Sequence, residues 1–326
     1  MTLVVRIVLA GLLLGATLAS SAGALAQAGK QPRRPPVVQD YEPDPAIWLL
    51  EDADTRIYLF GTFHILPAGF RWRSPRFDGI VADADELVVE STEDADGSSA
   101  DALLADLRDS LAKRPRVSER LAPANRRKWL ALGKSVGLPP EYFDRMPPLL
   151  AMFGMALEWL QEESGSTAEY GVETVLEAEF AAAEKPIGSI ESSGEVFASL
   201  LGIDEGLMIK EIDRALSAWD GDSLATAFLD ETGEEIAMEP PLAEEHRWAQ
   251  GVQIDADGSL FGETPFGRVM NRVLLDDRNR AWAVWLERRL ETPGTVLVAV
   301  GAGHLEGSGS VQVMLTERGL SANRLN

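Results

Sequence analysis

Residues 56–64, RIYLFGTFH, and residues 295–304, TVLVAVGAGH, decide the fold of this chain. Each is a short apolar run, rich in β-branched or aromatic residues, that passes into a Gly-x-x-His sequence ending at His64 or at His304. Continuous apolar runs of this length are typical of strands that are buried on both faces of a sheet. We therefore predict two buried strands, each followed by a turn that carries a histidine.

Further strands and helices alternate around these two runs. Strands are predicted at 86–90 and 186–190, and the alternation of strands with helical patterns indicates the α/β class. Both ends of the chain read as strand, Gly-x-x-His, helix, strand, which predicts two related units whose turns face one another. The helical patterns cover residues 77–84, 99–112, 124–136, 148–163, 172–184, 194–217, 266–290 and 310–318.

The amino terminus has the pattern of an export signal. Residues 1–6 are short and basic, residues 7–18 are apolar, and small residues follow, with a cleavage site predicted after Ala26. The apolar run is too short to span a bilayer as a helix. We therefore expect a signal peptide over residues 1–26 and a secreted or periplasmic protein with no integral membrane span after cleavage.

The rest of the chain divides by composition. A proline-rich linker is predicted over residues 27–45, followed by one α/β body over residues 46–326. The mostly helical middle, at about 99–217, is expected to be an insertion that forms a helical cap over the sheet. Residues at about 222–262 are rich in Glu, Gly and Pro and lack sustained periodicity, which predicts an acidic loop.

Charge and cysteine content exclude several classes of function. The chain has 52 acidic and 30 basic residues and a formal net charge of −22 at pH 7. Nucleic acid and anionic membrane surfaces are therefore not expected as partners, because phosphate binding needs a positive field. The chain contains no cysteine, so disulfides and thiol chemistry are excluded.

Two histidines and two glutamates follow predicted strands. His64 and His304 stand just past the strand ends, where open α/β sheets place their ligand sites, and Glu90 and Glu191 end two further strands. A carboxylate at the end of an apolar strand is costly unless a cation, a metal or a hydrogen-bond donor lies beside it. Two imidazoles with one or two carboxylates suit a divalent ion such as Zn²⁺, Mn²⁺ or Co²⁺, which would acidify a bound water.

Arg278 and Asn279 are further candidates, near the start of a predicted helix. A guanidinium next to a carboxamide could hold a substrate carboxylate or a developing oxyanion, although Arg278 could equally pair with surface acids. The third histidine, His246, lies in a charged segment and is interpreted as a surface residue. Competing patterns are missing from the sequence: it has no Gly-x-Ser-x-Gly elbow, no Walker loop and no His-Glu-x-x-His.

Together these motifs resemble the TraB/GumN family, which is similar to the TIKI metalloproteases and more distantly to the ChaN and erythromycin-esterase folds. The resemblance implies a central mixed β-sheet flanked by helices, with both Gly-x-x-His turns converging on one site. It also implies a metal-dependent peptidase activity for TIKI-like members. One departure is Glu173, where family members commonly have Asp. The motifs are YLFGTFHILP at 58–67, GVE at 171–173, RNRAW at 278–282 and VGAGHLEG at 300–307.

We therefore hypothesise an exported, metal-dependent hydrolase of peptide or cell-envelope substrates. In this hypothesis His64, His304 and Glu90 bind a Mn, Co or Zn ion, Glu90 and Glu191 are the catalytic carboxylates, and Arg278 with Asn279 assists them. One alternative is a metal-free esterase in which a histidine is the general base. The other is a non-catalytic protein that binds haem, a metal or an envelope polymer.

Overall fold

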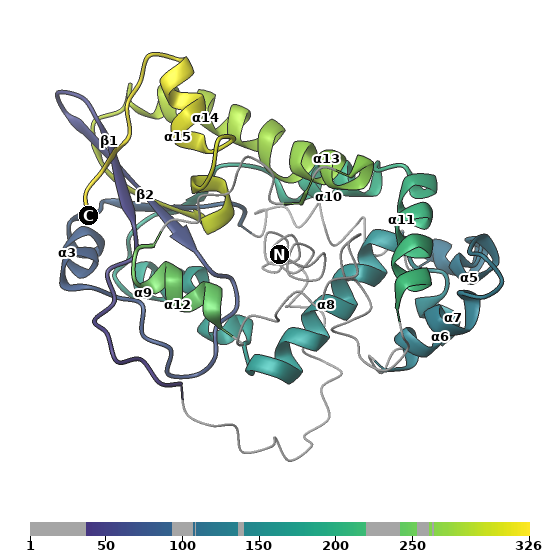
Figure 1. The fold of residues 1–326 in the computed structure, drawn as a ribbon. Coiled ribbons are helices and arrows are strands. Elements are labelled where there is room, and N and C mark those ends of the chain that lie inside the picture. The colour runs from purple at the N-terminus through teal and green to yellow at the C-terminus, as the bar shows by residue number, and fades with distance from the viewer. Residues whose placement is uncertain are drawn as a thin grey trace.

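The computed structural model describes residues 37–92, 107, 109–135, 140–219, 242–252, 261–262 and 264–326 (Figure 1). The strands are β1 (Ile47–Glu51), β2 (Thr55–Thr62), β3 (Glu86–Val89), β4 (Ile187–Ser189), β5 (Gly294–Gly301) and β6 (Asn323–Arg324). The helices are α3 (Pro75–Asp83), α5 (Val117–Arg120), α6 (Arg126–Ser135), α7 (Pro140–Phe143), α8 (Pro148–Ser164), α9 (Val172–Ala182), α10 (Ser193–Leu201), α11 (Glu205–Ala218), α12 (Ala243–Ala249), α13 (Pro265–Asn271), α14 (Asp277–Arg289) and α15 (Val311–Glu317). Short helical turns are η1 (Leu111–Lys113), η2 (Ala168–Tyr170), η4 (Arg272–Asp276) and η5 (Ala302–Leu305).

The strands form one six-stranded mixed sheet in the order β4-β3-β5-β2-β1-β6. The four strands β4, β3, β5 and β2 are parallel, whereas β1 and β6 are each antiparallel to their neighbours. Because β2 and β5 are adjacent and parallel, with Thr62 opposite Gly301, both Gly-x-x-His turns leave the same edge of the sheet. The α/β prediction with a mixed sheet flanked by helices is confirmed.

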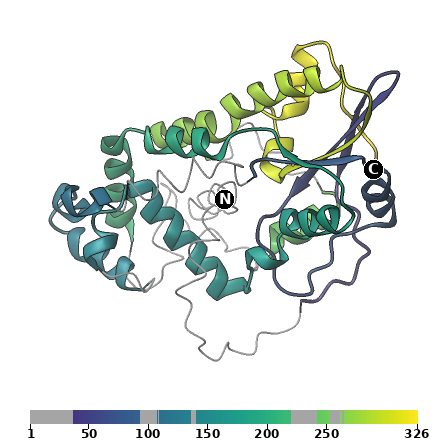
Figure 2. The same ribbon diagram turned by 180° about the vertical axis from the view of Figure 1, so that it is seen from behind.

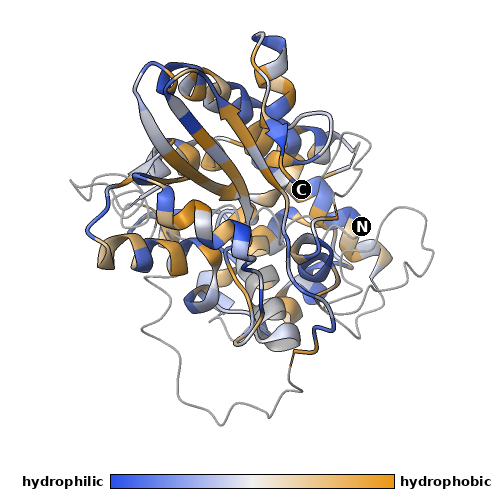
Figure 3. Cartoon of the chain, turned by 90° about the vertical axis from the view of Figure 1, so that its left-hand side faces the viewer, coloured by the Kyte–Doolittle hydropathy of each residue, from blue (hydrophilic) through white to orange (hydrophobic). Residues whose placement is uncertain are grey.

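Both faces of the sheet are buried. Along β5, Leu297 and Ala299 belong to one apolar cluster, while Val296, Val298 and Val300 belong to another on the opposite face, as the two-residue period of a strand requires. Helices α3 and α9 cover the first face and α14 and α15 the second (Figures 1 and 3). The prediction of buried strands from the apolar runs is therefore confirmed, because helices cover both faces of the sheet.

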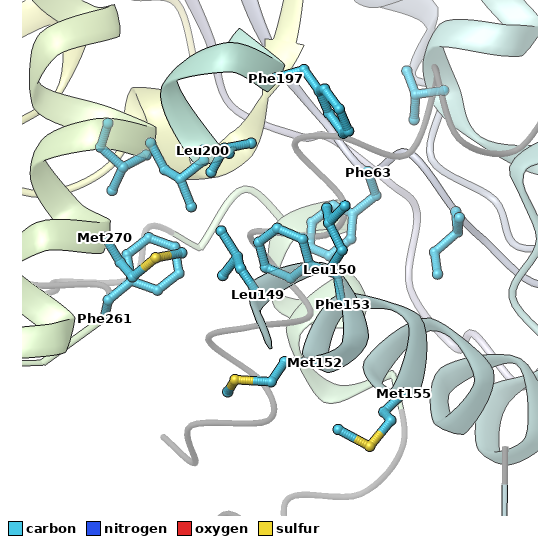
Figure 4. Packing of buried hydrophobic residues seen from close by; sticks show 14 of the residues in the cluster. Phe63, Leu149, Leu150, Met152, Phe153, Met155, Phe197, Leu200, Phe261 and Met270 are labelled. Atoms are coloured by element: carbon cyan, nitrogen blue, oxygen red, sulfur yellow. The ribbon is translucent and has the colours of Figure 1, made fainter. Parts of the chain in front are cut away.

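The middle of the chain is helical, and α5 to α8 and α11 lie away from the sheet (Figures 1 and 2). Helix α8 contributes Leu149, Leu150, Met152 and Phe153 to the main buried cluster, which also contains Phe63 beside the first histidine (Figure 4). These side chains are therefore core residues. None of the helices in the described ranges is long and apolar enough to cross a bilayer.

Three sequence predictions differ from the structure. The helix predicted at 194–217 is two helices, because Asp204 caps α11 by accepting a hydrogen bond from Leu207 N at 2.7 Å. The acidic segment at 222–262 was predicted as a loop but contains the short helix α12. The charged run at 244–247 lacks the apolar periodicity from which a helix is predicted. The two predicted units also end differently. The last strand of the second unit, β6, pairs with β1 at the side of the sheet, whereas the last strand of the first unit, β3, pairs with β5.

Several predicted segments fall outside the described residues. These are the signal peptide at 1–26, the first part of the linker, the start of the helix at 99–112 and most of the acidic segment. The described end of the linker runs along α12, where Asp44 N donates to Ala249 O at 2.8 Å. This contact holds α12 next to the first strand of the body.

The start of α9 docks directly onto the chain that leaves β2. Val172 N donates to Phe63 O at 3.0 Å, and Leu66 and Thr167 exchange two backbone hydrogen bonds at 3.2 and 3.0 Å. Gly171 makes this approach possible, since a Cβ built there would stand 2.0 Å from His64 O. Helix α9 therefore holds the backbone around His64 in place.

We predict that Gly171→Ala destabilises the fold by about 1–3 kcal/mol or more, because the added methyl group would overlap a backbone carbonyl. The measurement is the free energy of unfolding in urea. Gly154→Ala is the matched control, since among the described residues no atom lies within 4 Å of a Cβ built there. Gly154 lies inside α8, so its replacement should stabilise by about 0.5–1 kcal/mol. Equal effects of the two substitutions would contradict this account.

Candidate functional site

Four neighbouring parallel strands each deliver one polar side chain to the same edge of the sheet. In sheet order these are Glu191 after β4, Glu90 after β3, His304 after β5 and His64 after β2. The strand pairings place Val89 opposite both Ser189 and Ala299, so the chain ends lie side by side. The structure therefore brings together side chains that are up to 240 positions apart in the sequence.

Arg278 of α14 joins the two carboxylates. Its Nη2 donates to Glu90 Oε2 at 2.5 Å and also to Glu191, and its Nε donates to both Glu191 oxygens at 3.0 and 3.1 Å. Nη1 donates to Leu274 O at 3.1 Å, and Gly301 N donates to Glu90 Oε1 at 2.6 Å. Arg278 and Glu90 are buried, so this is a charged network inside the protein.

Trp282, one turn further along α14, links this network to His304. Its Nε1 donates to Glu191 Oε2 at 2.9 Å, and its ring centroid lies 4.1 Å from that of His304. The guanidinium of Arg278 lies 4.9 Å from the indole centroid. The indole therefore packs on the imidazole and holds Glu191 at the same time.

His304 has a defined tautomer. Asn279 Nδ2 donates to Gly309 O at 2.7 Å, so Asn279 Oδ1 faces His304 Nδ1 at 2.5 Å. An amide oxygen can only accept, so Nδ1 carries the proton and Nε2 keeps its lone pair. Burial lowers the pKa of His304 well below its ordinary value, and the charges of Arg278 and His64 lower it further. His304 therefore favours the neutral form, and its Nε2 lone pair is buried without a hydrogen-bond partner among the described residues.

His64 has the opposite environment. Its Nδ1 lies 2.7 Å from Glu173 Oε1, at ion-pair distance although not aligned as a regular hydrogen bond, and Thr62 Oγ1 donates to the same oxygen. Burial lowers the pKa of His64, but the charges of Glu173 and Glu90 outweigh it and the net shift is upward. The pKa of Glu173 is lowered in turn, because its interactions with His64 and Thr62 outweigh the effect of burial.

The pKa values of the two imidazoles are thus shifted in opposite directions. His64 favours the protonated form and His304 the neutral form, and each feels the charges of the same Glu90–Arg278 network. Environments that push two pKa values apart are how proteins assign a general acid and a general base at one pH. In chemical terms, the site can donate a proton from one imidazole and accept a proton at the other.

The side chains do not form the expected three-ligand metal centre as they stand. The Nε2 atoms of His64 and His304 are buried without a hydrogen-bond partner in the described part of the chain, so each could be a ligand. The third expected ligand, Glu90, has both oxygens engaged, one by Gly301 N and one by Arg278. Within the described ranges, no three His, Asp or Glu side chains are grouped so that they could hold a metal ion.

Arg278 and Asn279 are both bound to other groups of the site. Their polar atoms bind Glu90, Glu191, His304 and backbone oxygens, so they organise the site. The sequence analysis missed Glu173 as the partner of His64. The available signal was its position at the start of a predicted helix, two residues after Gly171.

His246 lies apart from these side chains and is only partly buried. Its Nδ1 contacts Tyr41 Oη at 2.7 Å, and its ring centroid lies 5.3 Å from that of Phe70. The imidazole therefore ties the end of the linker to α12, and it provides a control position for experiments on the other two histidines.

Comparison with known proteins gives a match over almost the whole body. The model of the TraB/PrgY/gumN family matches residues 46–324. The chain is similar to proteins of Escherichia coli (strain K12) and Shigella flexneri, both described as uncharacterized protein YbaP. Each is 27% identical over 273 residues, which cover 83% of this chain and 92% of the relative. No solved structure matches the chain. The family match spans all six strands and every side chain of the site.

We predict that Glu173→Gln lowers the pKa of His64, because burial is then opposed mainly by the more distant charge of Glu90. The measurement is an NMR titration of the imidazole signals, assigned with His246→Gln. Glu179→Gln is the matched control, since Glu179 lies on the same helix and pairs with Arg73 at the surface at 2.5 Å. A His64 pKa that stays unchanged in Glu173→Gln would show that this carboxylate does not hold the proton on the ring.

Proposed function

The chain belongs to the TraB/PrgY/gumN family, and on that premise we propose that it is a hydrolase that cleaves a peptide bond or a related amide or ester bond. The observation that carries the proposal is the pair of buried imidazoles with opposite pKa shifts at one sheet edge. Hydrolysis of a carbonyl compound needs a base for the attacking water and an acid for the leaving group.

In the proposed reaction His304 is the base. Its Nε2 takes a proton from a water molecule as the water oxygen attacks the carbonyl carbon, giving a tetrahedral intermediate. His64, held protonated by Glu173, then gives its proton to the leaving nitrogen or oxygen as the bond from carbon breaks. The proton on His304 passes to the departing products, and His64 is protonated again from solvent.

Arg278, Asn279 and Trp282 are positioning residues in this proposal. Asn279 fixes the tautomer of His304, and Trp282 packs on its ring. The positive charge of Arg278 lowers the pKa of His304 and thereby keeps the base free of a proton. Glu90 is held by Arg278 and contributes the negative charge that raises the pKa of His64.

The predicted signal peptide would place this reaction outside the cytoplasm, which favours a peptide or cell-envelope substrate. The net charge of −22 disfavours polyanionic substrates. Because Glu90 is engaged, no step of the reaction is assigned to a metal ion. A Mn, Co or Zn ion on His64, His304 and Glu90 would acidify a bound water, and the experiment below tests for that ion directly.

We expect His304→Ala and His64→Ala each to lower kcat/KM by roughly 10²–10⁴-fold on a cleaved peptide or ester, the usual contribution of one acid or base. A peptide library and an ester panel identify the substrate, and His246→Ala is the matched control. The pH profile should have its acid limb below 6.5 and its alkaline limb above it, following the shifts of His304 and His64.

Metal analysis, chelation and absorption spectra of the protein prepared without a His tag distinguish the metal-free hydrolase from a metal-dependent hydrolase and from a binding protein. We expect turnover to survive exhaustive chelation. A stoichiometric metal ion that is lost in both His64→Ala and His304→Ala, together with activity lost on chelation, would replace the metal-free steps with metal-assisted hydrolysis. A protein that cleaves nothing in either panel but carries haem, with a Soret band, would be a binding protein and would overturn the proposal.

A further inference from the structure

The positive charge of the chain is gathered at one end of the molecule. The segment from η1 to α7, residues 111–145, holds nine of the 30 basic residues but only three of the 52 acidic ones. Helices α5, α6 and α7 of this segment lie at the opposite end of the molecule from the sheet (Figures 1 and 2). We call residues 111–145 the basic tip. The net charge of −22 therefore conceals a strongly uneven distribution.

Some cations of the basic tip are used by the fold. Arg114 and Arg120 both pair with Glu205 of α11, and Arg145 donates to Arg114 O. Lys128 Nζ donates to two carbonyl oxygens at the carboxyl end of α11, at 2.5 and 2.7 Å. Other cations of the tip are exposed and form no ion pair with an acidic residue of the described ranges; these are Lys113, Arg127 and Lys134. The second group is therefore available to a partner.

The exposed side of α6 combines two of these cations with apolar groups. Leu130 lies three residues after Arg127 and four before Lys134, so the three side chains share one side of the helix. Leu130 is 37% exposed although it stands between two charges. Helix α7 packs against α6 through stacked aromatic rings and adds Tyr142, which is 54% exposed. The surface is thus basic and apolar at once.

This combination favours an extended partner over a single bound anion. A discrete anion needs donors that converge on one point, whereas Arg127 and Lys134 are seven residues apart, or about 10 Å along the helix axis. A bilayer with anionic lipids presents many negative headgroups in one plane. Just below them it has an interface in which leucine and tyrosine side chains are stable. Charge and apolar exposure therefore both fit the same partner.

We propose that the basic tip docks onto the surface of a lipid bilayer that contains anionic phospholipids. In this arrangement Arg127 and Lys134 contact the headgroups, and Leu130 and Tyr142 enter the interface. The acidic body does not cancel the attraction, because solution ions screen exposed charges over about 8 Å and the body lies at the other end of the molecule. It instead orients the sheet away from the bilayer. The inference goes beyond the proposed hydrolase function and does not depend on it.

The test is co-sedimentation with vesicles. The chain is used without residues 1–26, so that the predicted signal peptide does not contribute to binding. One set of vesicles contains phosphatidylglycerol and phosphatidylcholine, and the other contains phosphatidylcholine alone. We expect much stronger binding to the first set. This difference should disappear at about 1 M salt, where the screening length falls to about 3 Å.

Two independent variants test the residues of the tip. Arg127→Gln/Lys134→Gln should weaken binding to the anionic vesicles by roughly 30-fold, the effect of two cations near an anionic surface. Leu130→Ser should also weaken binding, because an apolar contact is lost without a change of charge. Arg56→Gln/Arg288→Gln is the matched control, since it removes two exposed cations from the body of the protein. The control should bind like the wild-type chain.

Thermal unfolding checks that the variants are folded, and their midpoints should match that of the wild-type chain because the replaced side chains are exposed. Equal binding to both sets of vesicles would overturn the inference, as would unchanged binding of Arg127→Gln/Lys134→Gln. Sedimentation velocity without vesicles tests another occupant, a second copy whose acidic body pairs with the tip. Salt-sensitive self-association that this variant abolishes, without any binding to vesicles, would assign the tip to protein contacts and overturn the membrane proposal.

Discussion

The ion-pair network of Arg278 with Glu90 and Glu191 is the interaction on which the rest of the site depends. Removing one partner from such a buried network leaves an uncompensated charge and costs about 3–5 kcal/mol. The same charges also act on the histidines: Glu90 raises the pKa of His64, and Arg278 lowers that of His304. One network therefore joins the ends of β3 and β4 to α14 and adds to the opposite pKa shifts that Glu173 and burial give the two imidazoles.

Topology explains how distant residues reach this network. Parallel strands point their carboxyl ends the same way, so β4, β3, β5 and β2 deliver their following residues to one edge. Helices on opposite faces then complete the site. Helix α14 supplies Arg278, Asn279 and Trp282 from one face, and α9 supplies Glu173 from the other. Each histidine is oriented by a different face of the sheet, which is why their environments differ.

The apolar runs of β2 and β5 were enough to predict the buried strands, and their equivalent Gly-x-x-His endings predicted the shared edge. The sequence did not reveal that Glu173 pairs with His64, because a contact across 109 positions is decided by how α9 docks and not by any local pattern. For the same reason the sequence left two interpretations of Arg278 open, substrate binding and pairing with acids, and did not indicate that its partners are Glu90 and Glu191. Local order was predictable from periodicity, and the partners of charged groups were not.

The most direct test of this account is a thermodynamic cycle on the network, measured as free energies of unfolding in urea. The chains are Arg278→Met, the double variant Glu90→Gln/Glu191→Gln, and the triple variant that combines them. We expect each partial removal to be strongly destabilising, and the triple variant to recover most of the loss because no unpaired charge is left buried. Losses that simply add in the triple variant would show that these charges do not form the network at the centre of the site.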